Sequence, residues 1–117
     1  MRNFRDLDVW KDAIVLVKKV YALVENLPEK EKFGLRSQIT RAVVSIPANI
    51  AEGCAKDSQK DFVRFLQMSL GSAFELETHL IICKELSYIF ETDTIIEDIN
   101  ILQKRINALL KYSKSQV

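Results

Sequence analysis

The sequence of 117 residues contains only three glycines and two prolines, so it is poor in the residues that form turns. An all-β domain needs a turn about every 8–12 residues, and this scarcity excludes that class. The longest apolar run, Ala13 to Val17, is far shorter than the roughly 20 residues that cross a membrane. With 48% hydrophobic and 28% charged residues, the chain has the composition of one globular domain, which we expect to span residues 1–117.

Cysteine and net charge are also low. Cys54 and Cys83 are too few for a disulfide scaffold, and both lie in helical patterns, as reduced, buried thiols do. Residues 1–6 contain no apolar segment of the signal-peptide type, so we expect a cytoplasmic protein with no membrane partner. Seventeen basic and sixteen acidic residues leave a net charge of +1. Because no overall field holds a polyanion, any nucleic-acid site has to be a local patch.

Apolar residues recur at intervals of three and four in four segments, which predicts four amphipathic helices. The segments cover roughly residues 6–26, 29–54, 58–88 and 93–112. In the first segment the expected core row is Leu7, Trp10, Ile14, Val17, Tyr21 and Val24. A second apolar row widens the apolar surface of this helix: Val9, Ala13, Leu16, Val20 and Leu23. The core rows expected in the later segments are Leu35, Ile39, Ala42, Ile46 and Ile50, then Phe62, Leu66, Ser69, Ala73, Leu76, Leu80 and Cys83, then Ile95, Ile99, Leu102, Ile106 and Leu109. Short connections between the helices predict an all-α, antiparallel, up-down-up-down four-helix bundle.

Local signals predict where the helices end and where one of them is irregular. Ser58 is placed to cap the third helix, and Thr94 begins a capping-box pattern for the fourth. Gly53 predicts the C-terminus of the second helix. Pro47, inside that helix, predicts a kink or a break. Gly71 and the small residues around it predict a surface that another helix approaches closely.

Several apolar residues lie off the expected core rows, beyond the roughly three per heptad that a small bundle needs. They are Val43, Val44, Leu70, Phe74, Ile81 and Ile82, together with the close group of Phe62, Phe65 and Leu66, of which Phe62 and Leu66 also belong to the expected core row. Exposed apolar patches of this size usually mark a protein interface. We therefore expect self-association into a homo-oligomer, with Val43, Leu70 and Phe74 at the contact. The alternative is a thick core that the stems of lysine and arginine partly cover.

A polar stripe on the second helix is another candidate for the oligomer interface. Its members recur at intervals of three and four: Gln38, Arg41, Ser45, Asn49 and Glu52. Asn49 can donate a hydrogen bond to the carbonyl that Pro47 leaves free, or to a neighbouring helix. Arg41 and Glu52 are three helical turns apart, so they can pair only with another helix or another subunit. The alternative is an ordinary solvated face.

Basic residues are concentrated between residues 30 and 64. This segment holds seven basic and four acidic residues, whereas residues 65–103 hold one basic and seven acidic residues. The candidates for nucleic-acid contact are Lys32, Arg36, Lys56, Lys60 and Arg64. Repeated around an oligomer, they form a basic band whose binding to RNA or DNA weakens as salt is added. A solvated face is again the alternative.

Residues able to carry chemistry are few. Glu75, His79 and Cys83 recur at intervals of four and can each ligate zinc, but they span about 12 Å of one helix, too far to hold one ion. His79 is the sole histidine. The glycine loops that cradle phosphates and the paired-cysteine motifs are missing. The sequence therefore predicts no enzyme, no metal, no cofactor and no small-molecule substrate.

One block of the second helix is highly specific, because residues 45–53 read SIPANIAEG. The residues around it add to the pattern: Leu7, Val9-Trp10 and Ala13, then Phe33-Gly34-Leu35, Ser37-Gln38-Ile39 and Arg41-Ala42, then Phe65-Leu66, Gly71-Ser72 and Glu75-Leu76-Glu77-Thr78. This ordered set resembles the four-helix-bundle proteins that are encoded by intervening sequences of bacterial large-subunit ribosomal RNA genes. That family is similar in fold to the accessory proteins of diversity-generating retroelements.

The resemblance implies a four-helix bundle that assembles into a homopentameric, barrel-like ring. It also implies a possible second role, because the retroelement relatives bind a reverse transcriptase and nucleic acid through basic outer surfaces. We therefore expect a non-enzymatic, self-assembling scaffold whose partner is itself. The alternative is an accessory protein that binds RNA or DNA, with RNA or a nucleic-acid enzyme as its partner.

Overall fold

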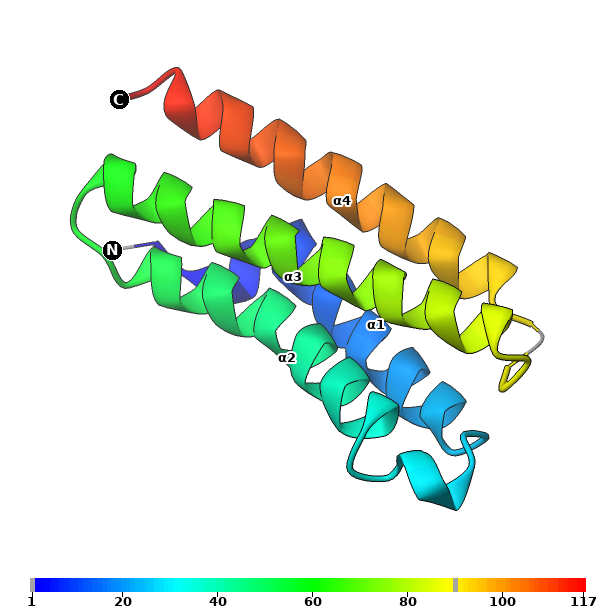
Figure 1. The fold of residues 1–117 in the computed structure, drawn as a ribbon. Coiled ribbons are helices and arrows are strands. Elements are labelled where there is room, and N and C mark those ends of the chain that lie inside the picture. The colour runs from blue at the N-terminus through cyan, green and yellow to red at the C-terminus, as the bar shows by residue number, and fades with distance from the viewer. Residues whose placement is uncertain (1, 90) are drawn as a thin grey trace.

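The structure is a computed structural model that describes residues 2–89 and 91–117. Its elements are η1 (Phe4–Asp6), α1 (Asp8–Val24), η2 (Glu29–Glu31), α2 (Leu35–Cys54), α3 (Gln59–Glu85) and α4 (Asp93–Lys114), where η denotes a short 3-10 helix. Over these residues there is no strand, which confirms the prediction of an all-α chain with four helices. None of the described helices is both long and apolar enough to span a membrane. The four α-helices lie alongside one another in a body of 45 × 22 × 19 Å (Figure 1).

Both termini lie at the same end of the molecule as the turn between α2 and α3 (Figure 1). The Arg2 amide donates to the Cys54 carbonyl over 3.3 Å, which ties the N-terminus to this turn. The side-chain amide of Gln59 donates to the Ser113 carbonyl, also over 3.3 Å, which places the C-terminal turn of α4 beside the start of α3. We call this the terminal end of the molecule. The far end holds the α1–α2 connection (residues 25–34) and the described residues of the α3–α4 connection (residues 86–89, 91 and 92).

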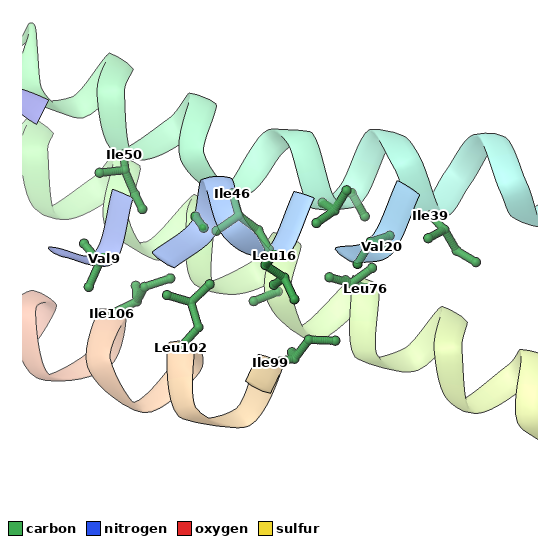
Figure 2. Packing of buried hydrophobic residues seen from close by; sticks show 14 of the residues in the cluster. Val9, Leu16, Val20, Ile39, Ile46, Ile50, Leu76, Ile99, Leu102 and Ile106 are labelled. Carbon is green, nitrogen blue, oxygen red and sulfur yellow. The ribbon is translucent and has the colours of Figure 1, made fainter. Parts of the chain in front are cut away.

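The core extends along the bundle and takes one row of side chains from each helix. Figure 2 shows Leu16, Ile46, Leu76 and Ile99 pointing from four different helices into this interior. The rows predicted for the later helices are confirmed almost entirely. Buried as expected are Ile39, Ala42, Ile46 and Ile50 of α2, Phe62, Leu66, Ser69, Ala73, Leu76, Leu80 and Cys83 of α3, and Ile95, Ile99, Leu102 and Ile106 of α4. Leu35 and Leu109, at the ends of two rows, are only partly buried.

The core row predicted for α1 is wrong. Ile14 and Tyr21 are 37% and 46% exposed, and Trp10 and Val17 are only partly buried. The buried row is the second one: Val9, Ala13, Leu16, Val20 and Val24. Both rows have helical spacing, so periodicity alone does not choose between them. The choice is made by packing, because the smaller residues of the buried row let α1 lie close to its neighbours.

Pro47 does not break α2, which continues from Leu35 to Cys54. A proline inside a helix removes one backbone hydrogen bond, and side chains add bonds on either side of this position. Ser69 Oγ of α3 donates to the Ile46 carbonyl, and Asn49 Nδ2 donates to the Ser45 carbonyl, each over 2.9 Å. The Asn49 side chain therefore bonds to a different carbonyl from the one that Pro47 leaves free.

The predicted caps differ in outcome. Ser58 caps α3 as predicted, because its Oγ accepts a hydrogen bond from the Asp61 amide over 3.1 Å. Thr94 does not cap α4, so the predicted capping box is wrong. The N-cap of α4 is Thr92, whose side chain makes no capping hydrogen bond. Its hydroxyl is buried and lacks a hydrogen-bond partner within the chain's described part.

Gly53 and Gly71 have opposite surroundings. Gly53 lies where α2 meets α3, and a Cβ at this position would stand 2.8 Å from the Phe65 Cβ. No glycine in the described ranges has a positive φ, so close packing rather than a left-handed cap explains Gly53. A Cβ on Gly71 would meet nothing within 4 Å. Within the described part of the chain no helix approaches Gly71 closely, so the predicted approach of another helix stays a prediction for a helix of another copy.

Candidate functional site

The first candidate surface lies along α1 and α2, and we call it the α1–α2 face. It consists of Trp10, Ile14, Val17, Tyr21, Val44 and Ala51, none of which is charged. Ile14, Tyr21 and Val44 are each about two-fifths exposed. Tyr21 shares a hollow with Thr40 of α2 and the exposed Phe33, which shows that this flank of α1 borders α2. The α1–α2 face is therefore an uncharged, mainly apolar surface that is partly exposed to solvent. Surfaces of this kind usually mark interfaces between proteins.

The second candidate surface lies along α3 beside α4, and we call it the α3–α4 face. Its apolar residues are Leu70, Phe74 and Ile81, of which Phe74 is 56% and Ile81 42% exposed. Glu77 falls in the same row, and its Oε1 accepts hydrogen bonds from Asn100 and Gln103 of α4 over 3.0 and 2.9 Å. This row therefore lies on the flank of α3 that borders α4.

The two faces lie on opposite sides of the bundle. Each helix packs against two others, with contacts between α1 and α2, α2 and α3, α3 and α4, and α1 and α4. In such a square arrangement the surface over α1 and α2 lies across the core from the surface over α3 and α4. One chain thus presents two different apolar surfaces that point in opposite directions.

The side of the bundle between α1 and α4 is bridged by ion pairs. Lys19 Nζ lies 2.9 Å from Asp98 Oδ2, and Arg105 pairs with Asp12. Between them lie the exposed residues Val15 and Ile101, in a hollow of about 240 Å³. On this side, ion pairs within one chain connect α1 to α4, so it differs from the two apolar faces.

The predicted interface residues fall in three different places. Val43 is fully buried within its own chain, so its assignment to an interface between copies is wrong. Phe62, Phe65 and Leu66 are also buried in the chain, and they are not excess surface. Leu70 and Phe74 lie on the α3–α4 face. Ile14 and Tyr21 were missed as surface residues because their spacing equals that of a core row.

The predicted polar stripe of α2 lies on the flank that borders α3. Gln38, Arg41 and Ser45 share a shallow hollow with Glu75 of α3. Arg41 and Glu52 are exposed, and neither forms an ion pair with any residue in the described ranges. The stripe therefore has free charges of both signs, and it lies apart from Leu70 and Phe74.

Glu75, His79 and Cys83 do not gather into a site. His79 Nε2 lies 3.4 Å from Glu75 Oε2, whereas Cys83 is buried in the core. In residues 2–89 and 91–117 no group of three His, Cys, Asp or Glu side chains is arranged to hold a metal ion. Burial raises the pKa of the Cys54 and Cys83 thiols; Arg2 opposes the rise at Cys54, and Glu31 adds to it at Cys83. Both thiols stay protonated at neutral pH and are weak nucleophiles.

The five predicted nucleic-acid contacts do not form one patch. Lys32 and Arg36 lie at the far end, where Arg36 pairs with Glu25 over 3.0 Å. Lys56, Lys60 and Arg64 follow the other end of α2, whose length separates the two groups by about 30 Å. The expectation of one continuous basic patch is therefore wrong for a single chain.

At the terminal end, cations gather over two aromatic rings. Arg2 Cζ lies 3.9 Å from the centre of the Phe62 ring. Lys56 Nζ and Arg64 Cζ lie 5.1 and 5.5 Å from the centre of the Phe65 ring. We call Arg2, Lys56, Lys60 and Arg64 the terminal cluster. The sequence did not reveal Arg2 as a member, because it is more than fifty residues away from the others along the chain.

Comparisons of the sequence and of the fold with known proteins identified a family and a similar solved structure. The sequence model of the family described as "23S rRNA-intervening sequence protein" matches residues 5–108. A crystal structure from Bacteroides thetaiotaomicron VPI-5482 is similar, with a TM-score of 0.78 and 27% sequence identity over 88% of this chain and 98% of that chain. It is described as a protein of unknown function from the S23 ribosomal protein family. Among curated proteins, none matches this chain.

Proposed function

Because the chain belongs to the 23S rRNA-intervening sequence protein family, we propose that it is a non-enzymatic scaffold of the cytoplasm. Its antiparallel four-helix units associate into a homo-oligomeric ring, which we propose to be a pentamer. The partner of each chain is therefore another copy of the same chain. The family model covers most of the chain, including all of the α1–α2 face and all of the α3–α4 face.

The α1–α2 face is the observation that carries this proposal. Fully burying a large apolar side chain gains about 1.5–3 kcal/mol, so covering two-fifths of one gains on the order of 1 kcal/mol. Ile14, Tyr21 and Val44 belong to the uncharged α1–α2 face, and the free energies gained by burying each of them add up when a second molecule covers this face. The described part of the chain has no element left to cover them.

The mass of the protein in solution tests the scaffold proposal. At micromolar concentration, light scattering after size exclusion should give a multiple of the 13.5 kDa chain mass, and five chains are expected. Ile14→Lys combined with Val44→Lys should give a folded monomer, because two buried ammonium groups cost more than the contact gains. Val15→Lys is the matched control, since Val15 is 52% exposed on the same helix but lies on the α1–α4 side. A wild-type protein that stays at the mass of one chain would reject the proposal.

A second candidate function is binding of RNA or DNA, and the terminal cluster favours it. Arg2, Lys56 and Arg64 come from two segments of the chain and meet at one end of the bundle, and the exposed Lys60 lies one helical turn before Arg64. The two phenylalanine rings beneath the cations are buried, so they do not stack on bases but hold the cations in place by cation–π contacts, and the cluster would bind phosphate groups. Around a ring, each copy adds one such cluster.

Charge reversal at the two ends of α2 tests nucleic-acid binding. Lys56→Glu with Lys60→Glu should abolish binding of a single-stranded oligonucleotide at low salt, because each lost phosphate contact also removes the release of a counterion. Lys30→Glu with Lys32→Glu changes the net charge equally at the far end and should leave most of the binding intact. Fluorescence anisotropy at several salt concentrations measures both. Equal losses in the two variants, or binding that does not respond to salt, would count against a site at the terminal cluster.

A further inference from the structure

We infer that the two apolar faces pair with each other between copies, so that the α1–α2 face of one chain packs against the α3–α4 face of the next. This inference rests on the proposed self-association and adds which surfaces meet. It makes the contact head-to-tail, in which each chain uses one surface toward one neighbour and a different surface toward the other.

The positions of the two faces support head-to-tail pairing. A symmetric dimer through the α1–α2 face would leave Phe74 and Ile81 of both chains in water, and these side chains are 56% and 42% exposed. A symmetric dimer through the α3–α4 face would leave Ile14 and Val44 uncovered instead. Pairing of unlike faces covers both at every contact. Because each contact uses two different surfaces, such contacts repeat from chain to chain, and they close into a ring when the rotation between successive copies completes a full turn.

The two faces also match in length. The apolar row of α1 runs from Trp10 to Tyr21, and that of α3 runs from Leu70 to Ile81. Each row therefore spans 12 residues, or 11 steps along the helix, which corresponds to about 16 Å. Two rows of equal length can cover each other without leaving apolar residues beyond the contact.

Along α1 and α3, the unpaired charges next to the two apolar rows are opposite in sign. Lys11 and Lys18 lie one helical turn before and after Ile14, beside the α1–α2 face. Glu77 lies one turn after Phe74, within the row of the α3–α4 face, and its Oε1 accepts hydrogen bonds from α4. Glu85 lies one turn after Ile81, beside this face. Within residues 2–89 and 91–117, none of these four side chains takes part in an ion pair. Both pairs are spaced by about two turns, so the two lysines of one copy can face the two glutamates of the next.

Mixing two variants tests the pairing directly. One variant carries Ile14→Lys and Val44→Lys, and the other carries Phe74→Lys and Ile81→Lys. Each alone should run as a folded 13.5 kDa chain, as judged by sedimentation and circular dichroism. An equimolar mixture should form a 1:1 dimer of two 13.5 kDa chains and grow no further, because one intact surface of each kind remains. If the Phe74→Lys/Ile81→Lys variant keeps the wild-type mass, the pairing of unlike faces is wrong.

A charge swap tests the contact in the full assembly. Lys18→Glu should raise the concentration at which the wild-type assembly dissociates by roughly tenfold, because it brings two carboxylates together. Adding Glu85→Lys to the same chain should restore assembly, since the exchanged groups meet between copies. Adding Glu52→Lys gives the same net charge but should not restore it. A wild-type monomer would defeat the proposed function itself, whereas an assembly that the Glu85→Lys exchange does not restore would defeat only this pairing.

Discussion

Replacing Gly53 with alanine should lower the free energy of unfolding by about 2 kcal/mol, within the roughly 1–3 kcal/mol that overpacking a core costs. The new methyl group would stand 2.8 Å from the Phe65 Cβ and 3.3 Å from Phe62 Cδ1. A Cβ atom is fixed to its backbone, so it cannot rotate away. Relief requires α2 and α3 to move apart, and that movement would loosen the packing of the core at the terminal end.

Gly71→Ala is the matched control for this prediction. A methyl group there meets nothing within 4 Å, and alanine favours the helix over glycine by about 1 kcal/mol. Gly71→Ala should therefore raise the free energy of unfolding by about that amount. Denaturation by urea, followed by circular dichroism, measures both variants. Equal effects of the two substitutions would show that α2 and α3 are not in close contact at Gly53.

Shortening Leu16 to alanine should cost about 2–5 kcal/mol of stability, as removing a buried leucine side chain does. Leu16 is 3% exposed, and the cavity left by its side chain would lie among residues of all four helices. Ile14→Ala should cost less, about 1–2 kcal/mol in the single chain, because Ile14 is already 37% exposed to solvent. The two residues belong to the two competing apolar rows of α1.

The comparison requires chains that do not associate, since association adds to the apparent stability. Both substitutions are therefore made in a Val44→Lys background and compared by urea denaturation. A larger loss from Ile14→Ala than from Leu16→Ala would mean that α1 is rotated and that the first row forms the core.

Helix α3 shows what periodicity can establish. All seven residues of its predicted core row are buried, because the rival row of Leu70, Phe74 and Ile81 has fewer apolar residues and is interrupted by Glu77. Helix α1 carries two apolar rows. The spacing predicts the row with larger side chains as the core, and the structure buries the other row. The choice depends on how closely α2 and α4 approach, which no local pattern contains. The same ambiguity concealed the α1–α2 face, since its residues had been assigned to the interior.

The distances in space between residues of different helices are also not contained in any local pattern of the sequence. Lys32 and Lys60 fall in one basic segment of the sequence, yet the length of α2 separates them by about 30 Å. Arg2 is remote in sequence but lies over the Phe62 ring. Pro47 is a related case, because a side chain of α3 donates a hydrogen bond beside it and the helix continues. Each outcome depends on contacts between helices rather than within one.

Because both termini emerge beside the terminal cluster, the position of an affinity tag decides what an experiment can detect (Figure 1). A histidine tag or a biotin handle on either terminus emerges close to Arg2 and Lys60 and, once bound to a resin or a surface, hinders the approach of a polyanion to them. Chains immobilised through such a handle all present residues 25–34 to the solution. A handle placed in that connection, or removed by protease before measurement, leaves the cationic surface open.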